Sequence, residues 1–581
     1  MRTFRLCLTI ALAAGLWTAG SLRAQTGSAP HHVDPPGTPA HAHPAAEAPV
    51  AQPHSPAAGA SHEHDMGTAS EAAGAAGQAH DHLVAAAPDH RGAHDHADAP
   101  IVPDGWFVRL LLAATLSLAA LLFVVARRKR GTDSRMPALS GTDLLTVPLL
   151  GAFLRWRHFN TLLLAPTLLF FGIVVGAGLF GEQTTDNPAI LLTWILWWPA
   201  VIFTFFLVGR VWCVICPFGY VGDVAQKIVT LGRKAPRLLK NMWWRLGLFL
   251  LLTWFTTLFA LDRTPRSTAW LALTLTCGAV ALAVVYKKRV FCRYVCPVGG
   301  IFGLYSMTAP LALSARDQTV CKSRCRGKDC AAACTWFQFP AHMDRGAECS
   351  LCLDCVRACP HDNLALRAQP IGHDLAQFRS HRTSLDEATT VAAILGVSLL
   401  QTVVMLNAWG AWQAGPLLYT VIFSSFGVGI PLVLLAGLSW LASRGDRSSP
   451  GVAASLRMYA YAFLPLGLGL HAAHNFHHLF GEGGALWTGL RAWTANATGW
   501  ALAPAASGGV PAANANALFF MQWLALAGGL YLAWQVSAHL AGRHATDRAT
   551  ALRMAAPIQL FAVAYTVMSI LVLASPMAHR H

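Results

Sequence analysis

The sequence predicts an all-α polytopic membrane protein that carries one small insert of mixed α and β structure. Its 581 residues are 54% hydrophobic and only 12% charged, with 20 tryptophans, a composition typical of membrane proteins. Apolar windows long enough to cross a bilayer recur along the chain. A more polar, cysteine-rich segment interrupts them and predicts the insert.

About ten transmembrane helices are expected, because each crossing of the hydrocarbon core requires roughly 20 apolar residues. The windows cover residues 106–126, 158–181, 189–209, 244–261, 268–286, 387–410, 415–441, 456–480, 516–538 and 555–576. A further apolar stretch, residues 144–155, is too short to cross and is expected to lie in the membrane interface.

The N-terminus reads as an export signal. A basic start, an apolar stretch and small residues near Ala24 lead us to interpret residues 1–24 as a signal peptide, with an uncleaved anchor as the alternative. Residues 25–103 hold twelve histidines in a background rich in Ala, Pro, Gly and Asp, and this exported segment is expected to be disordered. Its imidazoles suit loosely bound copper, zinc or nickel; the alternative is a solvated spacer.

Positive charge predicts the orientation. Arg127, Arg128, Lys129 and Arg130 follow the first span, and such clusters belong on the cytoplasmic side. Later basic loops alternate consistently, so a bacterial inner-membrane protein is expected, with the His-rich segment in the periplasm. The formal net charge of +15 reflects this topology, and no nucleic-acid partner is expected.

The remaining boundaries follow from the same alternation. A membrane domain is assigned to residues 104–315 and a C-terminal membrane domain to residues 371–581. Between them, residues 316–370 form the predicted cytoplasmic insert, where a reducing compartment keeps thiolates available for iron.

The insert contains the compact run C-x2-C-x2-C-x3-C-P, which is typical of a bacterial ferredoxin-type [4Fe–4S] site. Its cysteines are Cys349, Cys352, Cys355 and Cys359. The alternative is a zinc site, since C-x2-C pairs also bind zinc. Zinc sites seldom combine four such closely spaced cysteines with a following proline, so an iron–sulfur cluster is favoured.

A second cysteine motif lies just upstream, with looser spacing and Thr335 where proline is usual. Its members are Cys321, Cys325, Cys330 and Cys334. In two-cluster ferredoxins the fourth cysteine of each motif binds the other cluster. With this crossed ligation, one cluster would be bound by Cys359 and the first three upstream cysteines. The other would be bound by Cys334 and the first three cysteines of the compact run. The segment is therefore interpreted as a ferredoxin-like α+β insert with two [4Fe–4S] clusters, the alternative being that the first motif is degenerate or binds zinc.

An internal repeat precedes the insert. A short motif begins at Arg210 and recurs 79 residues later at Arg289. It consists, in order, of an arginine, a valine, an aromatic residue, two cysteines, a proline and a glycine. Its cysteines are Cys213, Cys216, Cys292 and Cys296. Duplicated helix pairs commonly pack with pseudosymmetry, so these thiols could converge to bind a metal centre, form redox disulfides or brace the helix ends. The unequal spacing, x2 and then x3, weakens strict symmetry.

Two membrane hairpins that end in Cys-Pro motifs, followed by a double ferredoxin motif, resemble the NapH/NosR/CcoG group of membrane iron–sulfur proteins. The resemblance covers roughly residues 145–370, although the first Cys-Pro motif departs from the C-x3-C-P that is usual in the group. It implies a redox accessory role, with electrons passed between cytoplasmic or membrane donors and exported metalloenzymes, or support of their maturation.

A histidine cluster ends the span at 456–480. His471, His474 and His478 share one helix face, and ionisable groups in spans are usually functional. Copper or another transition metal fits this spacing, and Glu482 could add a ligand. Haem b is less favoured, because its candidate second ligand, His539, lies near the other end of its helix. The plain alternative is an interfacial, structural cluster.

These observations favour a membrane electron-transfer protein whose donor and acceptor the sequence does not identify. A cupric reductase or maturation factor and a redox sensor remain alternatives. No nucleophile–base set, phosphate loop or dinucleotide fingerprint is present, so hydrolase and NAD-enzyme classes are disfavoured, no catalytic residues are assigned, and enzyme status stays open.

Overall fold

A computed structural model provides the structure of the chain, which is mostly helical with one small sheet. The predicted signal peptide and nearly all of the His-rich segment lie outside the described residues. The structure describes residues 101–128, 141–325, 328–377, 383–412, 415–444, 450–498 and 514–577.

The first helical region ends with the second Cys-Pro motif. Its elements are α2 (Gly105–Arg128), η1 (Leu144–Thr146), α3 (Pro148–Arg155), α4 (Phe159–Phe180), α5 (Pro188–Ile190), η2 (Leu191–Trp197), α6 (Trp198–Val208), η3 (Gly209–Val211), α7 (Trp212–Ile215), α8 (Pro217–Ile228), η4 (Arg237–Leu239), α9 (Trp243–Leu258), α10 (Pro265–Val285), η5 (Phe291–Val295), α11 (Pro297–Tyr305) and η6 (Ser306–Thr308).

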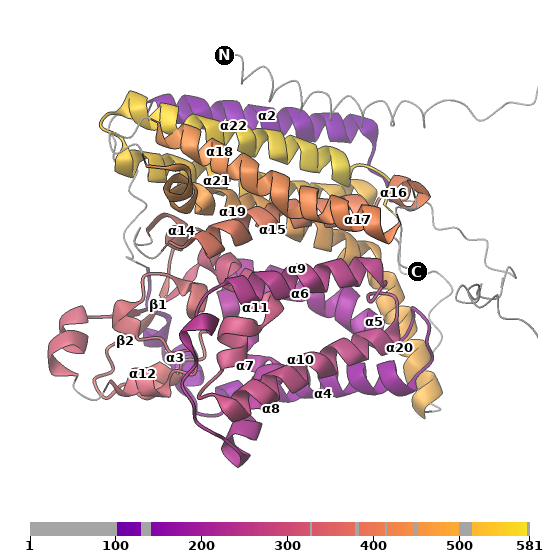
Figure 1. Cartoon of the computed structure of the whole chain (residues 1–581), viewed down its shortest axis with the longest axis vertical. Coiled ribbons are helices and arrows are strands. Elements are labelled where there is room, and N and C mark those ends of the chain that lie inside the picture. The colour runs from indigo at the N-terminus through magenta and orange to yellow at the C-terminus, as the bar shows by residue number, and fades with distance from the viewer. Residues whose placement is uncertain are drawn as a thin grey trace, which may run out of the picture. The chain divides into compact units, whose positions relative to one another are not determined.

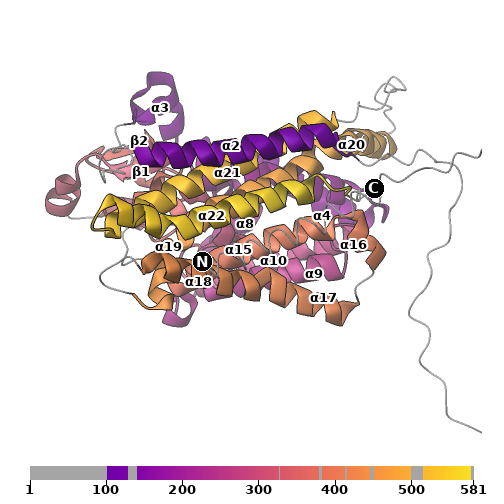
Figure 2. The same cartoon turned by 90° about the horizontal axis from the view of Figure 1, so that it is seen from above.

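The cysteine-rich insert is bracketed by two antiparallel strands, in which Leu313 of the first faces Leu366 of the second. Its elements are β1 (Leu311–Ala315), η7 (Val320–Arg324), α12 (Asp329–Ala333), η8 (Pro340–His342), η9 (Gly346–Glu348), α13 (Asp354–Arg357), β2 (Leu364–Ala368) and α14 (His373–Gln377). The sheet therefore begins five residues before the insert boundary expected at residue 316. Figures 1 and 2 both show the strands at one end of the helices and α20 (Gly483–Thr498) at the other.

The C-terminal region is helical throughout its described residues. Besides α20, its elements are α15 (Leu385–Val404), α16 (Asn407–Trp412), α17 (Pro416–Ile422), η11 (Phe423–Gly429), α18 (Ile430–Ser443), α19 (Val452–Phe476), η12 (His477–Gly481), α21 (Ala515–His544) and α22 (Arg548–Leu573).

Eight helical stretches of the described chain are long and apolar enough to cross a membrane. They are Gly105–Arg128, Phe159–Phe180, Pro188–Phe205, Pro265–Val285, Leu385–Val404, Pro416–Ser443, Ala515–His544 and Arg548–Leu573. The other two predicted spans are helices that fall outside this set. The window 244–261 is α9, which has 16 residues where a crossing needs roughly 20. The window 456–480 is α19 and its continuation η12, most of whose residues are buried inside the protein.

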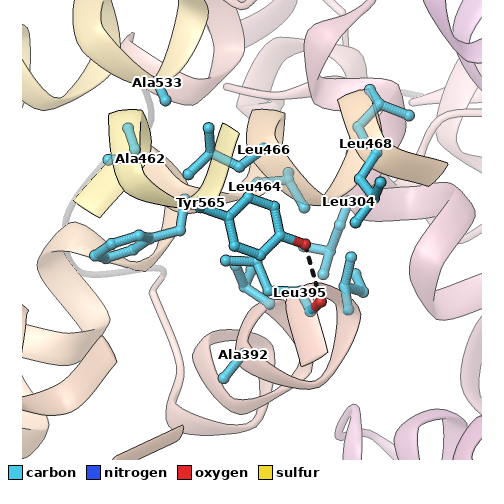
Figure 3. Packing of buried hydrophobic residues seen from close by; sticks show 14 of the residues in the cluster. Leu304, Ala392, Leu395, Ala462, Leu464, Leu466, Leu468, Ala533 and Tyr565 are labelled. Atoms are coloured by element: carbon cyan, nitrogen blue, oxygen red, sulfur yellow. Dashed lines mark hydrogen bonds between the residues drawn. The ribbon is translucent and has the colours of Figure 1, made fainter. Parts of the chain in front are cut away.

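The core of the C-terminal region is built around α19, which packs against α15 and α21. Close approach is possible because glycines face backbone: a Cβ on Gly469 would lie 2.8 Å from the carbonyl oxygen of Ala525, and one on Gly529 would lie 2.6 Å from that of Pro465. Small residues allow such contact where helices pack in a membrane. Figure 3 shows the surrounding leucines and alanines, with the Tyr565 hydroxyl donating to the Leu395 carbonyl at 3.0 Å.

The short apolar stretch at 144–155 forms η1 and α3, and it covers the insert. Leu145 is buried in the same apolar cluster as Leu353 and Leu364. Arg316 donates to the Asp143 carboxylate at 2.8 Å, which ties this stretch to the end of β1. The stretch is too short to cross a membrane, as predicted, and the structure adds that it packs on the insert.

Candidate metal centres

All thirteen cysteines within the described residues carry free thiols. Twelve of them fall into three groups of four, and the remaining one, Cys277, is exposed on α10. No disulfide joins the described cysteines, so the three groups have the chemistry of ligands.

The first group lines a cavity inside the insert. Four cysteines surround it together with Trp336, Pro340 and Met343, and they are Cys334, Cys349, Cys352 and Cys355. Burial raises the pKa of the Cys349 thiol to about 11 and that of Cys352 to about 12. Burial and then the neighbouring Cys349, Cys352 and Cys334 raise the pKa of Cys355 further. Four thiols crowded around a largely apolar cavity fit an iron–sulfur cluster, whose irons would bind them as thiolates.

The second group gathers around Asn363. Its side chain donates to Sγ of Cys321 at 3.2 Å, and its backbone N–H donates to Sγ of Cys359 at 3.4 Å. Burial and then the nearby Cys359, Cys325 and Cys321 raise the pKa of Cys330 to about 11. Cys359 thus lies with the upstream motif and Cys334 with the compact run, which is the grouping that crossed ligation requires.

The backbone around these cysteines contains residues in the left-handed region. Leu351 has φ of 56° and Leu353 has φ of 62°, on either side of Cys352, and Lys328 has φ of 52° before Cys330. Non-glycine residues adopt this conformation only when their surroundings impose it, and such strain concentrates at functional sites. The turns let cysteines close together in sequence face a common centre.

Replacing Asn363 by leucine is expected to lower the midpoint potential of a cluster held by the second group. The variant loses the side-chain hydrogen bond to Sγ of Cys321 and keeps the backbone bond to Sγ of Cys359. The lost bond stabilises negative charge on sulfur, which increases on reduction, and one bond is worth on the order of 50 mV. A redox titration followed by electron paramagnetic resonance (EPR) measures the potential. Asn160→Leu is the matched control, because Asn160 donates to the Cys352 carbonyl rather than to sulfur. Equal potentials in the Asn363 variant and the wild type would contradict the assignment.

The third group is formed by the two Cys-Pro motifs. Cys216 and Cys296 each stand directly before a helix, α8 and α11, whose first residue is proline, the position where proline is favoured. The unequal spacing is absorbed locally: Cys213 lies in the α-helical turn α7, while Cys292 lies in the wider π-helical turn η5, which accommodates the additional residue.

The thiols of the third group influence one another. Burial, and then other cysteines of the group with Cys213 among them, raise the pKa of Cys216, Cys292 and Cys296 to about 12. Arg289 opposes part of the rise at Cys292. The structure therefore brings together the four cysteines that the repeat suggested. Buried thiols that resist ionisation alone would lose their protons on binding iron. No three described cysteines converge on a single ion, so the donor set suits a multi-iron cluster rather than one metal ion.

The two repeats exchange their arginines. A Cβ on Gly219, in the first repeat, would lie 3.0 Å from Nη1 of Arg289, in the second. A Cβ on Gly299, in the second repeat, would lie 3.2 Å from Nη2 of Arg210, in the first. Each arginine thus occupies the space left by the glycine of the other repeat, which explains why arginine and glycine recur together with the cysteines.

The arginines have different partners. Arg289 forms an ion pair with Asp223 at 2.7 Å and donates to the Cys213 carbonyl at 2.8 Å. Arg210 donates from Nε to Sγ of Cys213 at 3.3 Å. Sequence reasoning marked both arginines as part of the repeat but assigned them no role, because their partners are distant in sequence.

The histidine cluster is divided between two contacts. His471 faces the Tyr305 hydroxyl at 3.2 Å. The Nε2 atoms of His474 and His478 lie 3.2 Å apart, and Nδ1 of His478 lies 3.1 Å from the Glu482 carboxylate. Within the described part of the chain, no three His, Cys, Asp or Glu side chains converge on a single ion. His471 is therefore separated from the other two, and a metal or haem at this cluster stays a prediction.

Comparison with known proteins bears on the third group. A family model described as a 4Fe-4S binding domain matches residues 190–238 and 268–314. These segments contain the two Cys-Pro motifs and none of the eight insert cysteines. No curated protein and no solved structure matches the chain. The match supports an iron–sulfur protein.

Proposed function

We propose that the chain is a membrane electron-transfer protein in which its three groups of four cysteines hold iron–sulfur clusters in series. The observation that carries this proposal is the arrangement of the groups. Cys330 of the second group lies close enough to Cys355 of the first to raise its pKa. Arg210 joins the first group to the third, since it contacts Cys213 and the Cys349 loop. When bound, the clusters would supply one-electron redox chemistry.

The protein's own residues provide the holding and shielding. Lys288, just before the second Cys-Pro motif, donates from Nζ to the carbonyls of Ala331 and Cys334 at 3.1 and 2.7 Å. Arg245 forms an ion pair with Glu348, the residue before Cys349, at 3.2 Å. These contacts fix the insert against the helices beneath it and keep water away from the cysteines.

The direction proposed is from a cytoplasmic or membrane donor, through the insert, toward an exported metalloenzyme or metal. It follows from the basic loops, which predict a cytoplasmic insert in a bacterial inner-membrane protein. Reporter fusions are the check: one near residue 90 should behave as exported and one near residue 345 as cytoplasmic. An exported signal from the second fusion would reverse the direction.

Vesicles test the transfer itself. With the protein reconstituted so that the insert faces out, a membrane-impermeant reductant outside should reduce an impermeant one-electron acceptor sealed inside. Transfer should stop in Cys216→Ser and persist in Cys277→Ser. Reduction of all clusters without transfer to the interior would favour the redox sensor.

A cupric reductase is the second candidate. The adjacent imidazoles of His474 and His478, with the buried Glu482 beside His478, favour it, because paired imidazoles suit copper. In the same vesicles, with Cu(II) as the interior acceptor, His474→Ala with His478→Ala should slow copper reduction about tenfold or more. His471→Ala, which removes contacts with Tyr305 and Trp198 and leaves the His474–His478 pair in place, is the matched control. An unchanged rate in the double variant would remove this histidine pair from the path.

A further inference from the structure

Arg210 is a fully buried cation between two groups of cysteines. Its side chain is 1% exposed. It donates from Nε to Sγ of Cys213 in the third group, at 3.3 Å, and from Nη1 to the carbonyl of Ala347, at 2.8 Å. Ala347 lies two residues before Cys349 of the first group. One guanidinium therefore contacts both the first and the third cysteine groups.

An aromatic ring extends this contact. The guanidinium of Arg210 lies over Trp336, with 4.2 Å between its carbon and the ring centroid. Trp336 is 1% exposed and lines the cavity of the first group beside Cys334 and Cys349. Stacking on tryptophan holds an arginine in one orientation and favours its charge. The cation is therefore fixed at the wall of the first cavity while it bonds to sulfur of the third group.

Arg210 lacks the partner that its counterpart has. Arg289 forms an ion pair with Asp223. Nη2 of Arg210 has no hydrogen-bond partner among the described residues, and the carboxylate that attracts Arg210, Glu348, is already paired with Arg245 at 3.2 Å. A buried charge without a close counterion is strongly unfavourable. Negative charge on the first and third cysteine groups, which lie on either side of Arg210, would compensate its positive charge.

We propose that Arg210 is a positioning residue that electrostatically couples the first and third cysteine groups, so that one fixed positive charge stabilises added negative charge on both. This inference rests on the proposed function, because it requires clusters at both groups. It assigns a shared charge to Arg210 and restricts Arg289 to the third group.

The test compares matched variants of the two repeat arginines by EPR-monitored redox titration of the full-length protein. Cys352→Ser and Cys216→Ser first identify the signals of the first and third groups. Arg210→Met should lower both midpoints, with the ratio of reduced to oxidised cluster at a fixed potential falling about tenfold, which is about 59 mV for one electron. Arg289→Met should lower only the signal of the third group. Arg210→Lys, which keeps the charge, should stay near the wild type.

Iron-replete Arg210→Met with either midpoint unchanged would overturn the inference. If Arg210→Met does not assemble its clusters, Arg210→Lys decides: assembly with near wild-type midpoints supports a charge requirement, and failure to assemble shows that only the shape of arginine matters and overturns it. The iron content of the wild type is measured separately, so a missing third cluster refutes the proposed function rather than the behaviour of Arg210.

Discussion

Replacing Cys216 and Cys296 together by serine should remove about four iron atoms from a protein that, purified without oxygen, holds about twelve. The twelve follow from three groups of four cysteines, and the loss follows because these two residues are half of the third group. Serine preserves volume but binds iron poorly, so the cluster should be lost while the helices remain. Iron and sulfide analysis measures the stoichiometry, and EPR shows which signal disappears.

Two variants calibrate this experiment. Cys277→Ser should keep all the iron, because Cys277 is exposed and belongs to none of the three groups. Cys352→Ser should lose the cluster of the insert and leave the third group loaded. A wild type with about eight irons, unchanged in the double variant, would show that the third group holds no cluster. Stoichiometric zinc without iron would refute iron–sulfur chemistry in all three groups.

Replacing Glu387 by alanine should detach the insert from the C-terminal helices. Glu387 lies in the first turn of α15 and binds Arg345 through two hydrogen bonds of 2.9 Å, while the Tyr461 hydroxyl also donates to it. Only 13% of the Arg345 side chain and 14% of the Glu387 side chain are exposed. Removing one member of such a pair leaves a buried charge alone and costs about 3–5 kcal/mol of the free energy of unfolding.

Denaturant titration of the insert's visible absorbance measures that cost. Asp362→Ala is the control. The Asp362 side chain is 62% exposed and pairs with Arg155 and Arg316, which are 39% and 29% exposed, and exposed pairs contribute about 0–1 kcal/mol each. Equal losses in the two variants would show that Arg345 and Glu387 do not anchor the insert. Easier proteolysis near residue 345 in the Glu387 variant is expected to accompany the loss.

The sequence predicts the helices and the cysteine groups, because each follows from a pattern of neighbouring residues. Apolar windows located most of the long helices, because a bilayer crossing demands a continuous run of apolar residues, but no window covered the 16-residue α20. The windows also covered α9 and α19, which fall outside the eight candidates chosen by length and composition. Cysteine spacing predicted the grouping of Cys334 and Cys359, because the spacing of ferredoxin motifs constrains which thiols can share a cluster.

The features that sequence did not predict depend on contacts between distant residues. Arg210 lies 126 residues from Trp336, which follows from their numbers, and no periodicity links them. Glu348 is similar: burial alone would raise the pKa of its carboxyl group, but Arg245, Arg210 and Arg293 outweigh burial and hold this pKa below its usual range. Three arginines around one carboxylate reflect tertiary packing. The histidines shared a helix face as predicted, yet a turn of one ring toward Tyr305 separates His471 from the others.

The exchange of arginines between the repeats has a consequence for biogenesis. During synthesis the first Cys-Pro motif leaves the ribosome 79 residues ahead of the second. Asp223 and Gly219 therefore cannot form their contacts with Arg289 until the second motif has been made. The contacts of Arg210 with Trp336 and Ala347 form later still, because these two residues are made after the second motif. The four thiols of the third group are therefore all present before Arg210 has its final partners, and we expect cofactor loading there to be completed after the insert has been translated.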